Sequence, residues 1–171
     1  MKPIIHVVFV LLLVYAFVGS TSAQAEDGSA AWLRYAALDG EAARAYTSLP
    51  AAAVLLGNTI VLTTARSELV RGVKSMLGRT LRVSSNIPHE DAILIGTFEQ
   101  LRNIAPDLKP RQNPSGDGYW LTSAQVHGHR CIVIAGASDR GALYGVFAFL
   151  SRIARHLNVS SLNDVQHSSR E

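Results

Sequence analysis

The sequence predicts an α+β domain in which a mixed β-sheet packs in two layers against helices. Three observations favour this class. Strands and helices follow one another in the order β, β, α, β, β, α, β, β, α, which is not the regular alternation of a doubly wound fold. A hairpin is predicted near residue 128, and a buried strand, a glycine loop and a long apolar helix follow from Arg130 to Arg155. A chain of 171 residues suits one domain of this kind.

The N-terminus has the features of a secretory signal peptide. Lys2 precedes an apolar run from Ile4 to Val18, and small residues end the segment at Ala25. We expect residues 1–25 to be removed and the protein to be secreted or periplasmic. The alternative is a membrane anchor, but the run of about 15 residues is shorter than the roughly 20 that a bilayer requires. No membrane partner is therefore expected after cleavage.

The charge balance argues against a nucleic-acid partner. The chain has 16 basic and 13 acidic side chains, and Lys2 is the one charged residue of the predicted leader, so 15 and 13 remain. The mature chain is close to neutral, and it contains no basic cluster of the kind that tracks a phosphate backbone.

The first half of the mature chain reads as two strands and a helix. Trp32–Leu38 alternates loosely and predicts a first strand, residues 40–50 a helical turn or loop, and Ala51–Leu56 a second strand. Residues 63–77 change to the helical period, with one apolar face and Thr63 or Thr64 as the cap: Ala65, Leu69, Val73, Met76 and Leu77. Gly78 suits the left-handed position that ends a helix.

The next elements are shorter. Residues 80–84 predict a strand, Ala92–Ile95 a buried strand and Phe98–Ile104 a short helix. Residues 107–118 contain two prolines and two glycines and predict a surface loop. Residues 156–171 have no clear period, and we expect a mobile polar tail.

The last helix organises the chain. Tyr119–Val126 and the strand from His129 form the predicted hairpin around His127-Gly128. Cys131–Ile134 is a buried run, and Ser138 or Asp139 is expected to cap the helix that follows. Its apolar residues cover well over half of the circumference, so a second neighbour besides the sheet is expected, inside or outside this chain: Leu143, Tyr144, Val146, Phe147, Phe149, Leu150 and Ile153.

The candidate chemical motifs are weak. Gly136 and Gly141 flank a loop between strand and helix, but no Lys-Ser or Lys-Thr follows, so a tight turn is favoured over a nucleotide site, with Gly145 allowing close packing. His127 and His129 lack a third metal ligand. A nucleophilic Cys131 beside these histidines is disfavoured, because apolar surroundings raise a thiol pKa.

Carboxylates and aromatic residues give no clear site either. Glu90-Asp91 is an adjacent acidic pair, and Asp39, Glu41, Asp117 and Asp139 lie in predicted loops. Trp32, Trp120 and Tyr119 suit sugar stacking, although core packing is the commoner role. Asn158-Val159-Ser160 has the form of a glycosylation sequon. We therefore assign no catalytic, cofactor-binding or metal residue and expect no cofactor.

Six segments in order resemble the N-terminal domain of α-glucuronidases of glycoside hydrolase family 67. They are Trp32–Tyr35, Glu68–Gly72, Met76–Arg79, Ile93–Thr97, Gly118–Leu121 and Ile134–Gly145. The resemblance covers residues 26–155. The segment that ends in Tyr144-Gly145 is also similar to the non-catalytic domain of β-hexosaminidases, which implies a sandwich like the second domain of those enzymes.

The resemblance implies a function for the whole enzyme. Members of the family remove 4-O-methylglucuronic acid from xylan fragments by an inverting mechanism, with carboxylates on a central (β/α)8 barrel against which the N-terminal domain packs. A barrel alone takes about 250 residues, so none of the family's catalytic positions carries over to this sequence. The expected partner is that barrel, and residues 156–171 would begin the linker to it.

Three hypotheses follow. The first is an inactive N-terminal module of an exported α-glucuronidase. The second is a stand-alone module that binds xylo-oligosaccharides on Trp120 or Trp32. The third is a subunit on which a separately encoded barrel docks, against the helix that contains Leu143–Ile153.

Overall fold

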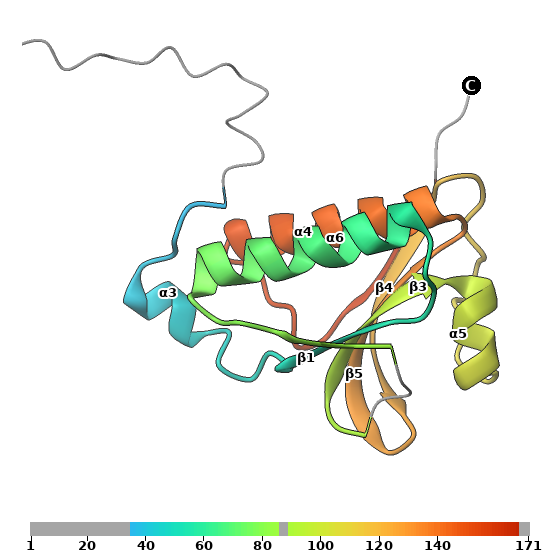
Figure 1. Ribbon diagram of the computed structural model, residues 1–171, viewed down its shortest axis with the longest axis horizontal. Helices are drawn as coiled ribbons and strands as arrows, with labels where there is room; N and C mark the ends of the chain where they lie inside the picture. The colour runs from blue at the N-terminus through green and yellow to red at the C-terminus, as the bar shows by residue number, and fades with distance from the viewer. Residues whose placement is uncertain (1–34, 86–88, 168–171) are drawn as a thin grey trace, which may run out of the picture. The chain divides into compact units, whose positions relative to one another are not determined.

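The computed structural model describes residues 35–85 and 89–167 (Figure 1). The predicted leader, its cleavage point and Trp32–Arg34 lie outside these residues. The described elements are α3 (Gly40–Arg44), β1 (Ala52–Leu55), α4 (Ile60–Leu77), β2 (Arg82–Ser84), β3 (Ala92–Thr97), α5 (Phe98–Ile104), β4 (Tyr119–Val126), β5 (His129–Gly136), α6 (Asp139–Ala154) and β6 (Asn163–Gln166). None of the described helices is long and apolar enough to span a bilayer.

The described strands form one mixed sheet in the order β2-β1-β3-β5-β4-β6. β2, β1, β3 and β5 are parallel neighbours, whereas β4 runs antiparallel to both β5 and β6. In the hairpin Val126 pairs with His129, as the sequence predicts. The predicted α+β class is therefore confirmed.

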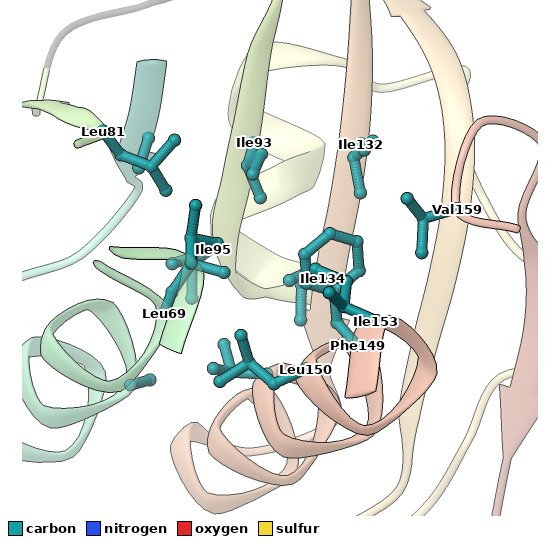
Figure 2. Close-up of a cluster of buried hydrophobic side chains, with 14 of the residues drawn as sticks. Leu69, Leu81, Ile93, Ile95, Ile132, Ile134, Phe149, Leu150, Ile153 and Val159 are labelled. Atoms are coloured by element: carbon teal, nitrogen blue, oxygen red, sulfur yellow. The ribbon is translucent and has the colours of Figure 1, made fainter. Parts of the chain in front are cut away.

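Helices α4 and α6 lie side by side over one face of this sheet (Figure 1). Figure 2 shows the core between them, in which isoleucines of β3 and β5 meet Leu69 of α4 and Phe149, Leu150 and Ile153 of α6. The isoleucines are Ile93, Ile95, Ile132 and Ile134. Because side chains alternate along a strand, Leu94 and Val133 face the other way. They join a second cluster with Leu101 of α5.

Helix α6 has the second neighbour that its apolar circumference predicts, and this neighbour is α4. A Cβ atom on Gly72 would lie 2.6 Å from Leu150 Cδ2, so the two helices approach closely at a glycine. Gly145 similarly brings α6 onto Ile134 of the sheet, where an added Cβ would lie 2.8 Å from Cγ2. Of the predicted apolar positions, Tyr144 is exposed.

The start of α4 differs from the prediction. The helix begins at Ile60 and Thr59 is its cap, with the Leu62 N–H donating to Thr59 Oγ1 at 3.2 Å. Thr64, a predicted cap, instead donates its hydroxyl to the Ile60 carbonyl at 2.9 Å. Ile60 is 86% exposed, so its side chain breaks the apolar pattern on which the prediction rested. The end at Gly78, with φ of 66°, agrees with the prediction.

At both ends of the described chain the structure differs from the predicted secondary structure. Tyr35–Leu38 is not a strand, and its Leu38 N–H donates to the Met76 carbonyl near the C-terminal end of α4 at 2.9 Å. Residues 163–166 are not a mobile tail, because they pair with β4 as strand β6. Val159 and Leu162 are buried and hold the connection from α6 against the core. The sheet thus extends beyond the predicted domain end at Arg155.

Candidate functional surfaces

The glycine loop between β5 and α6 is filled by backbone. A Cβ atom on Gly136 would lie 2.1 Å from Ala142 N, and one on Gly141 would lie 2.4 Å from the Gly118 carbonyl oxygen. Ser138 caps the helix by accepting from the Gly141 N–H at 3.1 Å, as predicted. The Ser138 hydroxyl also donates to Asp117 Oδ1 at 2.8 Å. The glycines therefore serve a tight strand-to-helix turn, which agrees with the reading favoured from sequence.

The histidine pair sits on the hairpin turn. His127 has φ of 50° and Gly128 φ of 83°, so both central residues are left-handed, as a type I′ turn requires. Among the described residues, His, Cys, Asp and Glu form no group of three or more that could hold a metal ion. His127 is exposed on this turn, whereas His129 is half-buried and begins β5.

Cys131 is packed in the second cluster, on the side of β5 that faces away from α4 and α6. Its side chain is 2% exposed, and burial raises the pKa of its thiol. A raised pKa lowers the thiolate fraction, which is the reactive form. This environment is the opposite of the one that activates a nucleophilic cysteine.

The acidic side chains are used in ion pairs and caps. Asp91 accepts from the Arg130 backbone N–H at 2.9 Å, a contact that holds the pKa of its carboxyl below the usual value, and it also pairs with the Arg130 guanidinium. Its neighbour Glu90 pairs with Arg82, so this adjacent pair diverges onto separate partners. Asp117 pairs with Arg140 at 3.0 Å, and Asp39 caps α3.

The two aromatic residues of β4 differ in burial. Trp120 is 4% exposed, and its indole N–H donates to Asn163 Oδ1 at 3.3 Å. Trp120 packs in the second cluster, the core role that the sequence favoured, and the alternative of sugar stacking is wrong for this residue because its ring is buried. Tyr119 is half-buried. Burial raises the pKa of its hydroxyl, and the negative charge of the nearby Asp164 raises this pKa further. Trp32 lies outside the described residues.

Two pockets among the described residues have both a carboxylate and an arginine in their walls. The first, of about 330 Å³, lies between residues 48–50 and Val159-Ser160, with Asp91 and Arg130 in its wall. The second, of about 570 Å³, lies where α6 meets β6, and its wall includes Tyr119, Arg152 and Arg155. None of the four pockets located in the described part of the chain has more than one carboxylate in its wall.

The second pocket is the site that sequence reasoning missed. Arg152 pairs with Asp164 of β6 at 2.9 Å, and the buried Arg152 Nε has no hydrogen-bond partner among the described residues. The pocket exists because β6 returns alongside β4, whereas the sequence predicted a tail there. The arginines at the end of α6 were visible in the sequence, but nothing indicated an opposite wall.

Fold and surfaces together define an α+β domain in which several described carboxylates form ion pairs or helix caps. A family model described as the N-terminus of glycosyl hydrolase family 67 matches residues 31–149, so the chain belongs to this family. The resemblance seen in the sequence is confirmed.

The curated relatives are fungal α-glucuronidases. The chain is 38% identical over 138 residues to an α-glucuronidase of Hypocrea jecorina, and the matched segment covers 77% of this chain and 16% of the relative. It is 36% identical over 149 residues to α-glucuronidase A of Emericella nidulans, with 84% and 17% covered. The chain thus spans about one sixth of the length of these relatives.

Among solved structures, a family GH115 4-O-methyl-α-glucuronidase with specificity for decorated arabinogalactans is 18% identical, with a TM-score of 0.45. The likeness covers 60% of this chain and 13% of that one. It is too weak to support an inference about function.

Proposed function

We propose that this chain is the N-terminal, non-catalytic module of an exported α-glucuronidase that removes 4-O-methylglucuronic acid from xylan fragments. In this proposal hydrolysis belongs to a (β/α)8 barrel, and the present domain supports it. The observation that carries the proposal is the family match over residues 31–149. The segment that matches this chain makes up about one sixth of the length of the α-glucuronidase relatives.

The described carboxylates support this division of labour. Inverting hydrolysis of a glycosidic bond requires two carboxyl groups about 6.5–9.5 Å apart across the bond. Here Glu68 pairs with Arg71, Asp91 with Arg130 and Asp164 with Arg152. The backbone N–H and guanidinium of Arg130 hold the pKa of Asp91 below its usual value, and a carboxyl with a lowered pKa is a poor general acid. We expect no hydrolysis by this chain alone.

The proposal is tested with two proteins and one substrate. The purified chain and the Hypocrea jecorina α-glucuronidase are each incubated with aldouronic acids, and released 4-O-methylglucuronic acid is measured. We expect release by the relative and none by the chain. Release by the chain that scales with its concentration and survives further purification contradicts the proposal.

A graft gives a positive readout of the same proposal. The matched N-terminal segment of the Hypocrea enzyme is replaced by residues 26–167 of this chain, so that β6 is retained. A supporting module should give a soluble chimera that still turns over aldouronic acids. A folded chimera that does not turn them over would show that these residues cannot replace the module.

A second candidate function is the binding of acidic xylo-oligosaccharides, and the pocket between α6 and β6 favours it over the tryptophan surface. Its volume of about 570 Å³ is within the range of small-ligand sites. Arg152 and Arg155 against the single Asp164 leave it positively charged, and guanidinium groups bind carboxylates in a two-pronged geometry. Tyr119 adds an aromatic wall.

Calorimetric titration decides this candidate. Aldouronic acid should give heat at millimolar ligand, neutral xylo-oligosaccharide of equal length should give less, and Arg155→Ala should reduce the first signal severalfold. Arg102→Ala, which removes an exposed arginine on α5, is the matched control and should bind normally. Equal heats for acidic and neutral sugars, or none for either, would exclude a uronate site here.

A further inference from the structure

We propose that Asn158 carries an N-linked oligosaccharide. The inference rests on the exported state included in the proposed function, and it adds a modification site on the loop between α6 and β6. Asn158-Val159-Ser160 satisfies the acceptor pattern Asn-x-Ser/Thr with a residue other than proline in the middle. The fungal origin of the curated relatives makes a glycosylating secretory route the relevant one.

The structure presents the acceptor atom to solvent. Asn158 is exposed, four residues after the end of α6 at Ala154. Its Oδ1 accepts from the Ser160 backbone N–H at 2.6 Å. This bond to the backbone two residues further on is the one that defines an Asx-turn. No hydrogen bond of Asn158 Nδ2 occurs in the described part of the chain. A sugar on Nδ2 therefore leaves the local hydrogen bonding intact.

The middle residue fixes the direction of this loop. Val159 is 3% exposed and belongs to the core between the sheet and the two long helices. Its burial holds the loop from inside, while Asn158 and Ser160 on either side are exposed. An oligosaccharide on Asn158 thus extends into solvent and displaces no core side chain.

The transfer step balances with one co-reactant, a lipid-diphosphate-linked oligosaccharide. The bond between the anomeric carbon and the diphosphate oxygen breaks, and a bond from that carbon to Asn158 Nδ2 forms. The amide loses one proton, and the lipid diphosphate leaves with the bonding electron pair. No oxidant or reductant takes part.

The sequence contains its own comparison. Asn113-Pro114-Ser115 has the same outer residues, but proline occupies the middle position, which blocks acceptor function. Asn113 is also exposed. Exposure and a nearby serine are thus shared by the two asparagines, and the middle residue separates them. We expect modification at Asn158 and none at Asn113.

The test uses the full chain secreted from a yeast host. Intact-mass measurement should show a sugar mass that peptide-N-glycosidase removes, and peptide mapping should place the resulting Asn-to-Asp conversion at Asn158. Asn158→Asp keeps the side-chain oxygen that accepts from Ser160, and it should lose the sugar completely. Ser160→Ala should also lose it, whereas Ser160→Thr should retain it.

The outcomes separate this inference from the export proposal. If the natural leader fails to export the chain, export is contradicted, and the same variants are made behind the host's own leader. Secreted wild-type protein with an unmodified Asn158, from either leader, overturns the inference. A sugar that persists in Asn158→Asp overturns it as well.

Discussion

The Arg79 side chain joins the loop after α4 to the segment between α3 and β1. Its Nη1 donates to the Tyr46 carbonyl and its Nη2 to the Leu49 carbonyl, each at 2.7 Å. These carbonyls belong to the segment between α3 and β1, while Arg79 directly follows the glycine that ends α4. A guanidinium suits this position because its fork presents several donors in a fixed plane.

We predict that Arg79→Ala destabilises the fold. Both carbonyls lose a charged donor in a partly buried place, and hydrogen bonds to charged groups contribute about 1.5–3 kcal/mol each to stability. We expect the free energy of unfolding in urea to fall by about 2–4 kcal/mol, since the two losses overlap. Arg102→Ala should change it by less than about 0.5 kcal/mol, as is usual at the surface. Equal effects of the two changes would contradict this role.

Residue-level features were predictable from sequence where their causes are local. Gly78 at the end of α4, the left-handed turn at His127-Gly128 and the Ser138 cap each depend on neighbours within a few residues. The Arg79 contacts join residues 30 and 33 positions apart, so they depend on the packed fold. The Trp120 bond to Asn163 spans 43 positions and could not be predicted for the same reason.

At the scale of elements, two strand predictions show what a pattern cannot supply. Tyr35–Leu38 alternates like a strand, yet its Leu38 N–H donates to the Met76 carbonyl of α4 and not to a neighbouring strand. Residues 163–166 show no alternation, yet they form β6, since β4 offers an edge with unpaired N–H and C=O groups. A strand requires a partner, and the sequence of one segment does not show whether a partner is present.

Two glycine replacements should separate close packing from simple propensity. Gly136→Ala places Cβ 2.1 Å from Ala142 N and 2.4 Å from the Ser138 carbonyl oxygen, both backbone atoms, so β5 and α6 must move apart. We expect a loss of about 3 kcal/mol in the free energy of unfolding, at the upper end for overpacking. A Cβ atom added at Gly40, in α3, meets no other atom within 4 Å. Gly40→Ala should therefore stabilise the protein by up to about 1 kcal/mol, because alanine has the higher helix propensity. Thermal denaturation of both variants measures this, and a neutral Gly136→Ala would contradict the contact.

At the scale of the whole molecule, the sheet separates two apolar clusters, and different elements shield each cluster from solvent. The cluster beneath α4 and α6 is covered by two long helices. The opposite cluster is covered by the short α5 and residues of the loop after it, including Leu108. Cys131 lies in this second cluster, so its thiol is protected only while the sheet and that cover stay together.

Thiol labelling should therefore report unfolding of the whole domain. Native protein at pH 8 should react with an aromatic disulfide reagent at least about 10³-fold more slowly than urea-unfolded protein, as expected for a domain stable by about 5 kcal/mol or more. The rate should rise along the urea transition followed by circular dichroism. Fast labelling of the native protein would mean that the second cluster opens independently of the rest.

The two outermost strands also affect how copies of the protein behave at high concentration. β2 has three residues and β6 has four, and each carries a charged side chain, Arg82 and Asp164. Short, charged strands of this kind offer few free backbone groups to a second sheet. Fibre growth by strand addition therefore has little to start from at either border of the folded domain.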